Sequence, residues 1–255
     1  MSKVFITGST DGLGLMAAQL LVKQRHTVVL HARNDERAVG ARTTLPEAEA
    51  VVVGDLASIA TTKDVAEQVN ALGTFDAVIH NAGVGYREHR IETVDGLEHV
   101  FAINVLAPYI LTALITRPER LIYLTSGMHS GGNPDFKDLQ WKHRRWNAAQ
   151  AYSDAKLFDV VLSAAIARQW TSVFSNAVGP GWVPTKMGGL GAPDDLEQAP
   201  ITQVWLAASN EPAARVSGKY FYHKKRLDPH PTAYDRNVQD QLLAVCEALS
   251  GVRLS

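Results

Sequence analysis

The chain has 255 residues, of which 46% are hydrophobic and 20% are charged, and its formal net charge is −1. This size and apolar content suit one large globular domain, or two small ones, with ample core. The near-neutral charge favours neither a nucleic acid nor an anionic membrane as a partner. Cys246 is the only cysteine, so no intrachain disulfide is possible and a reducing, cytoplasmic location is expected.

Further sequence features narrow the class of protein. A predicted strand begins within three residues of the N-terminus, and no apolar run reaches about 18 residues, so we expect neither a signal peptide nor a membrane span. No cluster of His, Cys and carboxylate residues has the spacing of metal ligands, so we expect no metal. Cys246 lies in an apolar helical run and is expected to be a core residue.

Short apolar runs rich in β-branched residues alternate with longer segments that can form helices. The predicted strands are Val4–Thr7, Thr27–Ala32, Ala50–Val53, Ala77–His80, Arg120–Ser126, Ser172–Val178 and Tyr220–Tyr222. The predicted helices are Leu13–Lys23, Asp35–Thr44, Thr61–Leu72, Asp95–Thr116 and Ala151–Trp170. This alternation predicts an α/β fold, a doubly wound Rossmann-type parallel sheet of about seven strands with helices on both faces, in a single domain over 1–255.

A glycine-rich turn joins the first predicted strand to the first predicted helix. It reads Thr7-Gly8-Ser9-Thr10-Asp11-Gly12-Leu13-Gly14. Its glycines allow positive φ and a close backbone approach, and the helix N-terminus offers N–H groups and a positive dipole to a pyrophosphate. The spacing is neither G-x-G-x-x-G nor that of a P-loop, which argues against phosphoryl transfer. We predict a dinucleotide-binding turn; the alternative is a merely tight turn.

The end of the second predicted strand indicates which dinucleotide is bound. An acidic residue at Ala32 would hydrogen-bond the ribose 2′-hydroxyl and repel a 2′-phosphate. Arg33 follows instead, and a guanidinium can hold a phosphate bidentately. We therefore predict NADP(H) in preference to NAD(H). Asp35 could reach the ribose and reverse this preference, and Arg33 could simply be an exposed arginine at a helix start.

Two long irregular segments follow predicted strands, at about 127–147 and 184–200. Long loops in compact α/β domains are commonly binding loops, and both segments leave the carboxyl edge of the sheet, where such folds bind ligands. We predict that they are substrate loops; the alternative is surface loop, pinned in the first case by its tryptophans. The basic cluster Lys142-His143-Arg144-Arg145 is interpreted as solvated.

Tyr152 and Lys156 are four residues apart on a predicted helix and should share one face. A cation about 5 Å from a phenol, at an effective dielectric constant of roughly 20, contributes about 3 kcal/mol, or roughly two pKa units. Tyr152 would thereby approach the pH range in which general acid–base catalysis is effective. Tyr220 and Lys224 have the same spacing, but on a predicted strand they would lie about 13 Å apart and could not couple.

The chain resembles the short-chain dehydrogenase/reductase family over nearly its whole length. Thr7-Gly8-x-x-x-Gly12-x-Gly14 is similar to that family's cofactor turn. His80-Asn81-Ala82-Gly83 is similar to its Asn-Asn-Ala-Gly motif, with His in place of the first Asn. Other matches follow in the family order: Asp55 and Leu56 to its adenine-contacting pair, Asn104 to its proton-relay asparagine, Ser126 to its catalytic serine, and Pro180, Gly181, Val183 and Thr185 to its nicotinamide loop.

The resemblance implies hydride transfer between a nicotinamide and a small-molecule carbonyl or alcohol. Tyr152 would be the general acid, and Ser126 would hydrogen-bond the substrate oxygen. Lys156 would lower the pKa of Tyr152 and bind the nicotinamide ribose, and Asn104 would hold a water that links Lys156 to solvent. Gly83, together with Asn81 and Ala82, would contact the cofactor. The assembly that the resemblance implies is a homodimer or homotetramer.

The chain departs from the common family pattern between its serine and its tyrosine. The gap from Ser126 to Tyr152 is 152 − 126 = 26 positions, about twice the usual spacing, and resembles the retinol-dehydrogenase-like and WW-domain-oxidoreductase-like branch. One alternative function is a non-catalytic NAD(P)-binding redox sensor or regulatory protein. A nucleotide-sugar epimerase would need a longer chain. His129, near Ser126, suggests a hydrolase triad, but Gly-x-Ser-x-Gly is absent.

Overall fold

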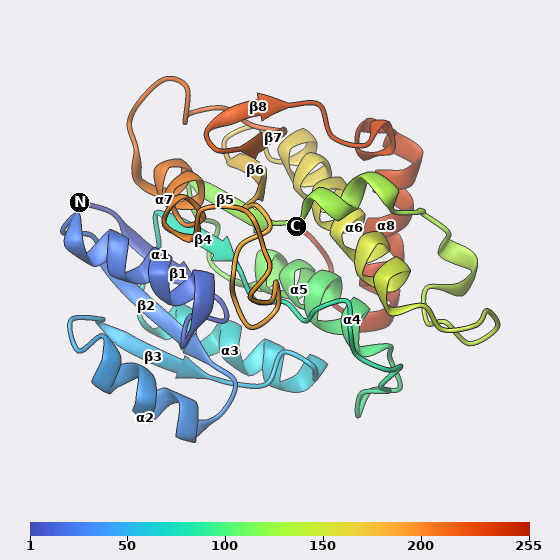
Figure 1. The fold of residues 1–255 in the computed structure, drawn as a ribbon, viewed down its shortest axis with the longest axis horizontal. Helices are drawn as coiled ribbons and strands as arrows, with labels where there is room; N and C mark the ends of the chain where they lie inside the picture. Colours follow the sequence, from blue (N-terminus) through green and yellow to red (C-terminus); the bar gives the residue numbers. More distant parts are fainter.

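Eight strands form one sheet in the order β3-β2-β1-β4-β5-β6-β7-β8 in the computed structural model, which describes residues 1–255 (Figure 1). The strands are β1 (Lys3–Ile6), β2 (Thr27–Ala32), β3 (Ala50–Val53), β4 (Ala77–His80), β5 (Arg120–Leu124), β6 (Phe174–Gly179), β7 (Lys219–Tyr222) and β8 (Lys225–Leu227). Neighbouring strands are parallel except for β7 and β8. The strand order reverses between β1 and β4, which is where doubly wound sheets bind ligands.

Helices cover both faces of this sheet, as Figure 1 shows. They are α1 (Gly12–Lys23), α2 (Asp35–Thr44), α3 (Ile59–Ala71), α4 (His99–Phe101), α5 (Ala107–Leu114), α6 (Ala148–Gln169), α7 (Ile201–Ala208) and α8 (Arg236–Ser250). Side chains of β1 alternate between two cores: Phe5 packs into the one that contains residues of α3, α5, α6 and α8, whereas Val4 and Ile6 pack into the one that contains residues of α1, α2 and α7. The three-layer architecture is therefore confirmed.

The predicted strands are confirmed with ends that shift by at most two residues, but the eighth strand was not predicted. β8 is a three-residue edge strand with all its side chains exposed, so it has no apolar pattern to detect. The turn before it consists of His223 and Lys224, both at positive φ. Such two-residue hairpins usually carry Asn-Gly or Asp-Gly, and the absence of that signal hid the hairpin.

One further helix was missed, and another was recognised only in part. α7 is buried along six of its eight residues, Thr202–Ala207, and so lacks the polar face that marks an amphipathic helix. α8 was recognised only through its apolar run; it ends at Ser250 and is followed by the C-cap residue Gly251, which adopts φ +65. Cys246 on α8 is fully buried, as expected, and burial raises its pKa far above the usual range of a thiol.

The predicted helix Asp95–Thr116 is divided by a π-helical segment, Ala102–Leu106, between α4 and α5. Pro108 has no N–H, so the carbonyl of Asn104 cannot form the regular i to i+4 hydrogen bond with it. The wider π turn, a feature common at functional sites, therefore contains Asn104. Strand β5 likewise ends at Leu124, so Ser126 lies two residues beyond the strand rather than at its end.

His80 occupies the position at which the family motif has asparagine, and it is completely enclosed at the end of β4. Its Nε2 lies 3.1 Å from Thr112 Oγ1, and its ring stacks on Tyr123 with centroids 4.7 Å apart. Burial lowers the pKa of His80 to about 3. The folded protein thus holds this imidazole neutral.

We expect His80 to make the fold sensitive to acid. An unfolded His80, with a pKa near 6.5, binds a proton below that pH, whereas the folded side chain excludes it until about pH 3. Its contribution to stability is complete above pH 6.5 and is lost as the pH falls, by about 2 kcal/mol between pH 7 and pH 5. Urea unfolding at both pH values should show a smaller acid loss for His80→Asn than for wild type. Equal losses would contradict this role.

Candidate active site

The glycine turn leads into α1 as predicted, with Gly8 at φ +61 and Gly12 at φ +53. A Cβ built on Gly12 meets nothing within 4 Å, so the turn faces open space there. Asp11 is the N-cap of α1 but makes no side-chain capping bond. The first backbone N–H groups of the helix are therefore not capped by a side chain, and the site suits an anion such as a pyrophosphate.

The loop after β4 is bonded directly to this turn. Asn81 Nδ2 donates to the carbonyls of Thr7 and Gly8 at 2.9 and 3.0 Å. Thr7 Oγ1 accepts from the backbone N–H groups of Asn81 and Ala82 at 3.0 and 2.9 Å. A Cβ on Gly14 would lie 2.5 Å from both Asn81 Nδ2 and Gly8 O. The two cofactor motifs predicted from separate parts of the sequence thus form one hydrogen-bonded unit.

His31 holds the turn from the side of β2, a role that sequence reasoning missed. Its Nδ1 accepts from the Gly8 N–H at 2.9 Å, and its Nε2 lies 2.9 Å from the Gly54 carbonyl. These partners require the neutral tautomer with the proton on Nε2. Burial lowers the pKa of His31, although the Gly54 carbonyl opposes that shift. The available signal was a histidine in the otherwise apolar, buried stretch 28–32 of β2.

Charged side chains surround the far end of the turn. Arg33 is exposed and makes no ion pair. Asp11 is bonded to Arg37 and Lys186 at 3.2 and 3.0 Å. Burial raises the pKa of Asp11, but these two cations outweigh it and hold that pKa below its usual range. Lys186 thereby links the predicted loop 184–200 to the dinucleotide turn, and Arg37 is a second cation near Arg33 that the sequence did not single out.

Asp55 and Leu56 follow β3 beside the His31 contact at Gly54. Asp55 Oδ1 accepts from the Ala57 N–H at 2.9 Å, and Leu56 is buried. Both lie at the same carboxyl edge of the sheet as the glycine turn.

Tyr152 and Lys156 lie on α6, and both are almost completely buried, at 6% and 5% exposure. Lys156 Nζ is 5.8 Å from the centroid of the Tyr152 ring, so the predicted shared face is confirmed. The ammonium donates to Leu124 O at 2.8 Å and to Asp159 Oδ2 at 2.7 Å. Burial opposes the charge of Lys156, but the Asp159 carboxylate, together with Tyr152, outweighs burial and raises the pKa of Lys156. Sequence reasoning missed this carboxylate.

Asn104 and Gly83 lie beside the lysine. Asn104 Oδ1 accepts from the Val84 N–H at 2.8 Å, and its Nδ2 donates to the Val84 carbonyl at 3.1 Å. A Cβ on Gly83 would lie 3.3 Å from Asn104 Oδ1 and 3.6 Å from Lys156 Nζ. The π turn therefore places Asn104 next to Lys156.

Ser126 lies beyond the end of β5, at the start of a short 3-10 turn. Its Oγ accepts from the Met128 N–H at 3.2 Å. The preceding Thr125 donates from Oγ1 to the Lys156 carbonyl at 2.6 Å and so ties this segment to α6. His129 Nδ1 lies 2.7 Å from the Ser126 backbone carbonyl, and its Nε2 accepts from the His230 N–H at 3.3 Å. Neither His129 nitrogen contacts the Ser126 hydroxyl, which agrees with the rejection of a hydrolase triad on sequence grounds.

Apolar groups from two loops cover the Tyr152 phenol. Met187 Sδ lies 3.8 Å from the phenolic oxygen. A Cβ on Gly85 would lie 2.9 Å from Met187 Cγ, and the Tyr86 ring is 5.7 Å from the Tyr152 ring. Both loops border the site, but only 184–200 was predicted from the sequence; the segment around Gly85 was not.

The loop containing Met187 begins in the predicted nicotinamide segment and is folded on itself. Gly181, after Pro180, adopts φ +96. The Thr185 N–H donates to the Val183 carbonyl at 2.7 Å, and Thr185 Oγ1 accepts from the Gly188 N–H at 3.1 Å. These contacts turn the chain so that Met187 reaches Tyr152.

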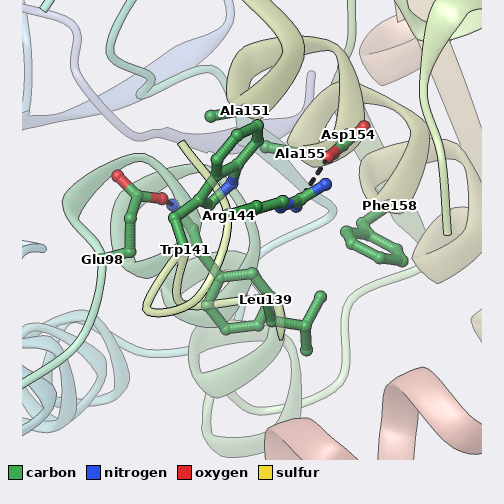
Figure 2. Close-up of a pocket in the computed structure, with 9 residues that line it drawn as sticks. Glu98, Leu139, Trp141, Arg144, Ala151, Asp154, Ala155 and Phe158 are labelled. Atoms are coloured by element: carbon green, nitrogen blue, oxygen red, sulfur yellow. Dashed lines mark hydrogen bonds and ion pairs between the residues drawn. The ribbon is translucent and has the colours of Figure 1, made fainter. Parts of the chain in front are cut away.

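The segment 127–147 packs against α6 through Trp141 and Arg144. Figure 2 shows the Arg144 side chain between Trp141 and Phe158, directed at Asp154. The guanidinium lies 3.5 Å from the Trp141 ring centroid, and its Nη2 is 3.2 Å from Asp154 Oδ2. The interpretation of this basic cluster as solvated is therefore wrong for Arg144. Asp154 lies two residues after Tyr152, so the loop is anchored beside the predicted catalytic residues.

A glycine-rich turn at a strand-order reversal, beside a buried tyrosine and lysine, is the arrangement expected of a Rossmann-type oxidoreductase. Residues 2–128 match the family model for short chain dehydrogenase. The chain is 44% identical to an uncharacterized oxidoreductase of Emericella nidulans, over 99% of this chain and 98% of that protein. It is 31% identical to human retinol dehydrogenase 13, over 98% of this chain and 84% of that protein.

Solved structures share the fold. A structure of an uncharacterized protein from Mycobacterium paratuberculosis superposes with a TM-score of 0.85 at 23% identity, over 100% of this chain and 95% of that one. Blue fluorescent protein from a metagenomic library, in complex with NADPH, superposes with a TM-score of 0.69 at 18% identity, over 90% and 97% of the two chains.

The chain belongs to the short-chain dehydrogenase/reductase family, within its retinol-dehydrogenase-like branch. It is an oxidoreductase that acts on CH–OH or C=O groups of a small molecule with a nicotinamide cofactor. No helix in the structure combines the length and the apolar character that a bilayer crossing requires.

Proposed function

We propose that the protein is an NADP(H)-dependent reductase of apolar ketones or aldehydes in which Tyr152 donates the proton. The observation that carries this proposal is the burial of Tyr152 next to Lys156, at the sheet edge that also holds the glycine turn. A hydroxyl in a water-poor site, beside a fixed cation, is suited to proton transfer. The continuous sheet supports one dinucleotide-binding domain over 1–255, with substrate loops at about 127–147 and 184–200.

Each residue of the site would have a distinct role in proton transfer or cofactor binding. Tyr152 gives its proton to the substrate oxygen, and Ser126 holds the same oxygen by a hydrogen bond. Lys156 stabilises the phenolate that remains, and Asn104 orders a water next to that ammonium. When bound, the nicotinamide supplies the hydride. Gly8–Gly14 and Asn81 would hold its pyrophosphate end, and Thr185 with Val183 would hold its carboxamide end.

An apolar substrate is supported by what covers the phenol. A thioether from Met187 and the ring of Tyr86 offer dispersion contacts and no strong polar partner. Met187 Sδ lies beside the phenolic oxygen to which the substrate oxygen must hydrogen-bond, so Met187 has to move when substrate binds. Retinol dehydrogenase 13 is, by its name, active on an apolar alcohol, which agrees with this class.

Arg33 is proposed to select NADP(H). We expect Arg33→Ala to weaken NADPH binding by about 2–3 kcal/mol, since a charge-assisted phosphate contact is lost, and to leave NADH binding nearly unchanged. Fluorescence titration of both cofactors measures this difference. Arg42→Ala, an exposed arginine at the other end of α2, is the matched control. Equal losses for both cofactors would refute the phosphate contact and leave Arg37 as the candidate.

A substrate screen tests the proposed function. Wild-type protein should oxidise NADPH in the presence of aryl ketones or long-chain aldehydes, and Tyr152→Phe, used as the blank, should not. NADPH binding without turnover on any carbonyl compound would instead support the alternative of a redox sensor.

A further inference from the structure

Asp159 is the counterion of Lys156, one helical turn further along α6. Its Oδ2 lies 2.7 Å from Lys156 Nζ, and the two side chains are only 3% and 6% exposed. Lys156 is the hydrogen-bond partner of this carboxylate in the structure, and the other acceptor of the ammonium is the Leu124 carbonyl. Burial raises the pKa of Asp159, and the Lys156 ammonium offsets only part of that rise. At their 2.7 Å separation the two groups form an ion pair.

A buried carboxylate changes what the ammonium does to the phenol. The positive charge favours the phenolate form of Tyr152, whereas the negative charge that is paired with it opposes that form. Two titratable groups act on Asp159, namely Lys156 on the same helix and Tyr123 from β5, and Lys156 in turn acts on Tyr152. Because water is excluded from the pair, solvent screens this carboxylate less than it screens a surface charge.

We propose that Asp159 is a positioning residue that fixes the Lys156 ammonium beside Leu124 and weakens its effect on Tyr152, so that the phenol keeps its proton at neutral pH and the enzyme favours carbonyl reduction over alcohol oxidation. The part that concerns the reaction direction rests on the proposed function of Tyr152. The part that concerns Tyr152 ionisation can be measured without cofactor or substrate.

The test is an ultraviolet titration of phenolate formation in the cofactor-free protein. Each variant is paired with the same variant carrying Tyr152→Phe, and the difference spectrum isolates Tyr152 from the other tyrosines, including Tyr123. Asp159→Asn should lower the midpoint of the Tyr152 titration by about one pH unit, the order of effect of a unit charge within the same buried site at an effective dielectric constant of roughly 20. If Asn destabilises the fold, Asp159→Leu removes the same charge without leaving a buried amide.

Two further variants distinguish the effect of the Asp159 charge from a general structural effect. Asp159→Glu retains the carboxylate and should leave the midpoint of the Tyr152 titration at its wild-type pH. Asp240→Asn removes an exposed carboxylate on α8. That carboxylate pairs with Arg168, which lies on α6 like Lys156, and its removal should not change the midpoint of the Tyr152 titration. A Tyr152 titration that stays unchanged or rises in the neutral variants would overturn the proposal. So would a shift in Asp240→Asn of the same size as that in Asp159→Asn.

The pH dependence of turnover extends the test to the reaction. In Asp159→Asn the alkaline limb for carbonyl reduction should move to lower pH by the same amount as the titration. If the titration moves as expected but no carbonyl compound is ever reduced, the proposed function is wrong while the role of Asp159 stands. If reduction occurs and neither measurement moves, the proposed function stands and the role of Asp159 is wrong.

Discussion

Tyr152→Phe should reduce turnover by about 10²–10⁴-fold and leave dinucleotide affinity unchanged. The substitution removes only the phenolic oxygen, the proposed proton donor, and general acid catalysis by a positioned group is worth about that much. The ring stays, and with it the packing against Tyr86. Steady-state turnover of a carbonyl substrate and fluorescence titration of NADPH measure the two quantities on the same protein.

The chain supplies a matched control in Tyr220→Phe. Tyr220 has the same spacing to Lys224 as Tyr152 has to Lys156, but it lies on strand β7, and the Lys224 ammonium lies over the Trp205 ring instead, 5.5 Å from its centroid. We expect its substitution to leave turnover unchanged. Full activity of Tyr152→Phe would remove Tyr152 from the mechanism, and equal losses in both variants would point to a structural effect of losing a buried hydroxyl.

Gly14→Ala should disrupt the dinucleotide turn. The added Cβ would lie 2.5 Å from the Gly8 carbonyl and from Asn81 Nδ2, and 2.9 Å from Ser9 Cα. Two of these are backbone atoms, so relief requires movement of the turn itself. Overpacking of this kind costs about 1–3 kcal/mol, which corresponds to roughly 5–150-fold in NADPH affinity if the cost falls on the binding conformation. Isothermal titration with NADPH and urea unfolding separate lost affinity from lost stability.

Gly40→Ala is the control for glycine replacement. Gly40 is an exposed residue within α2, and a Cβ there meets nothing within 4 Å. This substitution should stabilise the fold by about 0.5–1 kcal/mol, since alanine favours a helix, and should not change NADPH affinity. Normal NADPH affinity in Gly14→Ala would show that the turn does not contact the cofactor.

The parts of the fold that the sequence predicted are those with local signals. β2, β3 and β4 lie at the predicted residues because buried parallel strands are continuously apolar. β8 and α7 were missed because one is exposed throughout and the other is buried nearly all round, so neither shows a periodic contrast. The positions of β8 and α7 become clear only in the assembled sheet, where β8 pairs with β7 and α7 packs into the core.

The sequence motifs predicted the residues of the site that belong to those motifs. Residues of the site that lie outside the motifs were missed. Helical spacing placed Lys156 beside Tyr152, yet the same rule applied to i+3 would have placed Asp159 beside Lys156. His31 and Met187 could not be found in this way, because their partners Gly8 and Tyr152 are distant in sequence. Arg144 was misjudged since a basic cluster alone does not disclose that Asp154 and Trp141 enclose one of its members.

Transfer of deuterium from NADPH labelled at nicotinamide C4 tests the proposed function most directly. The protein is incubated with the labelled cofactor and a panel of aryl ketones and apolar aldehydes, and the alcohols are analysed by mass spectrometry. Wild type and Tyr220→Phe should form alcohol with deuterium on the former carbonyl carbon, and Tyr152→Phe should form almost none. Tight NADPH binding with no labelled alcohol from any compound, or equal labelling by Tyr152→Phe, would contradict it.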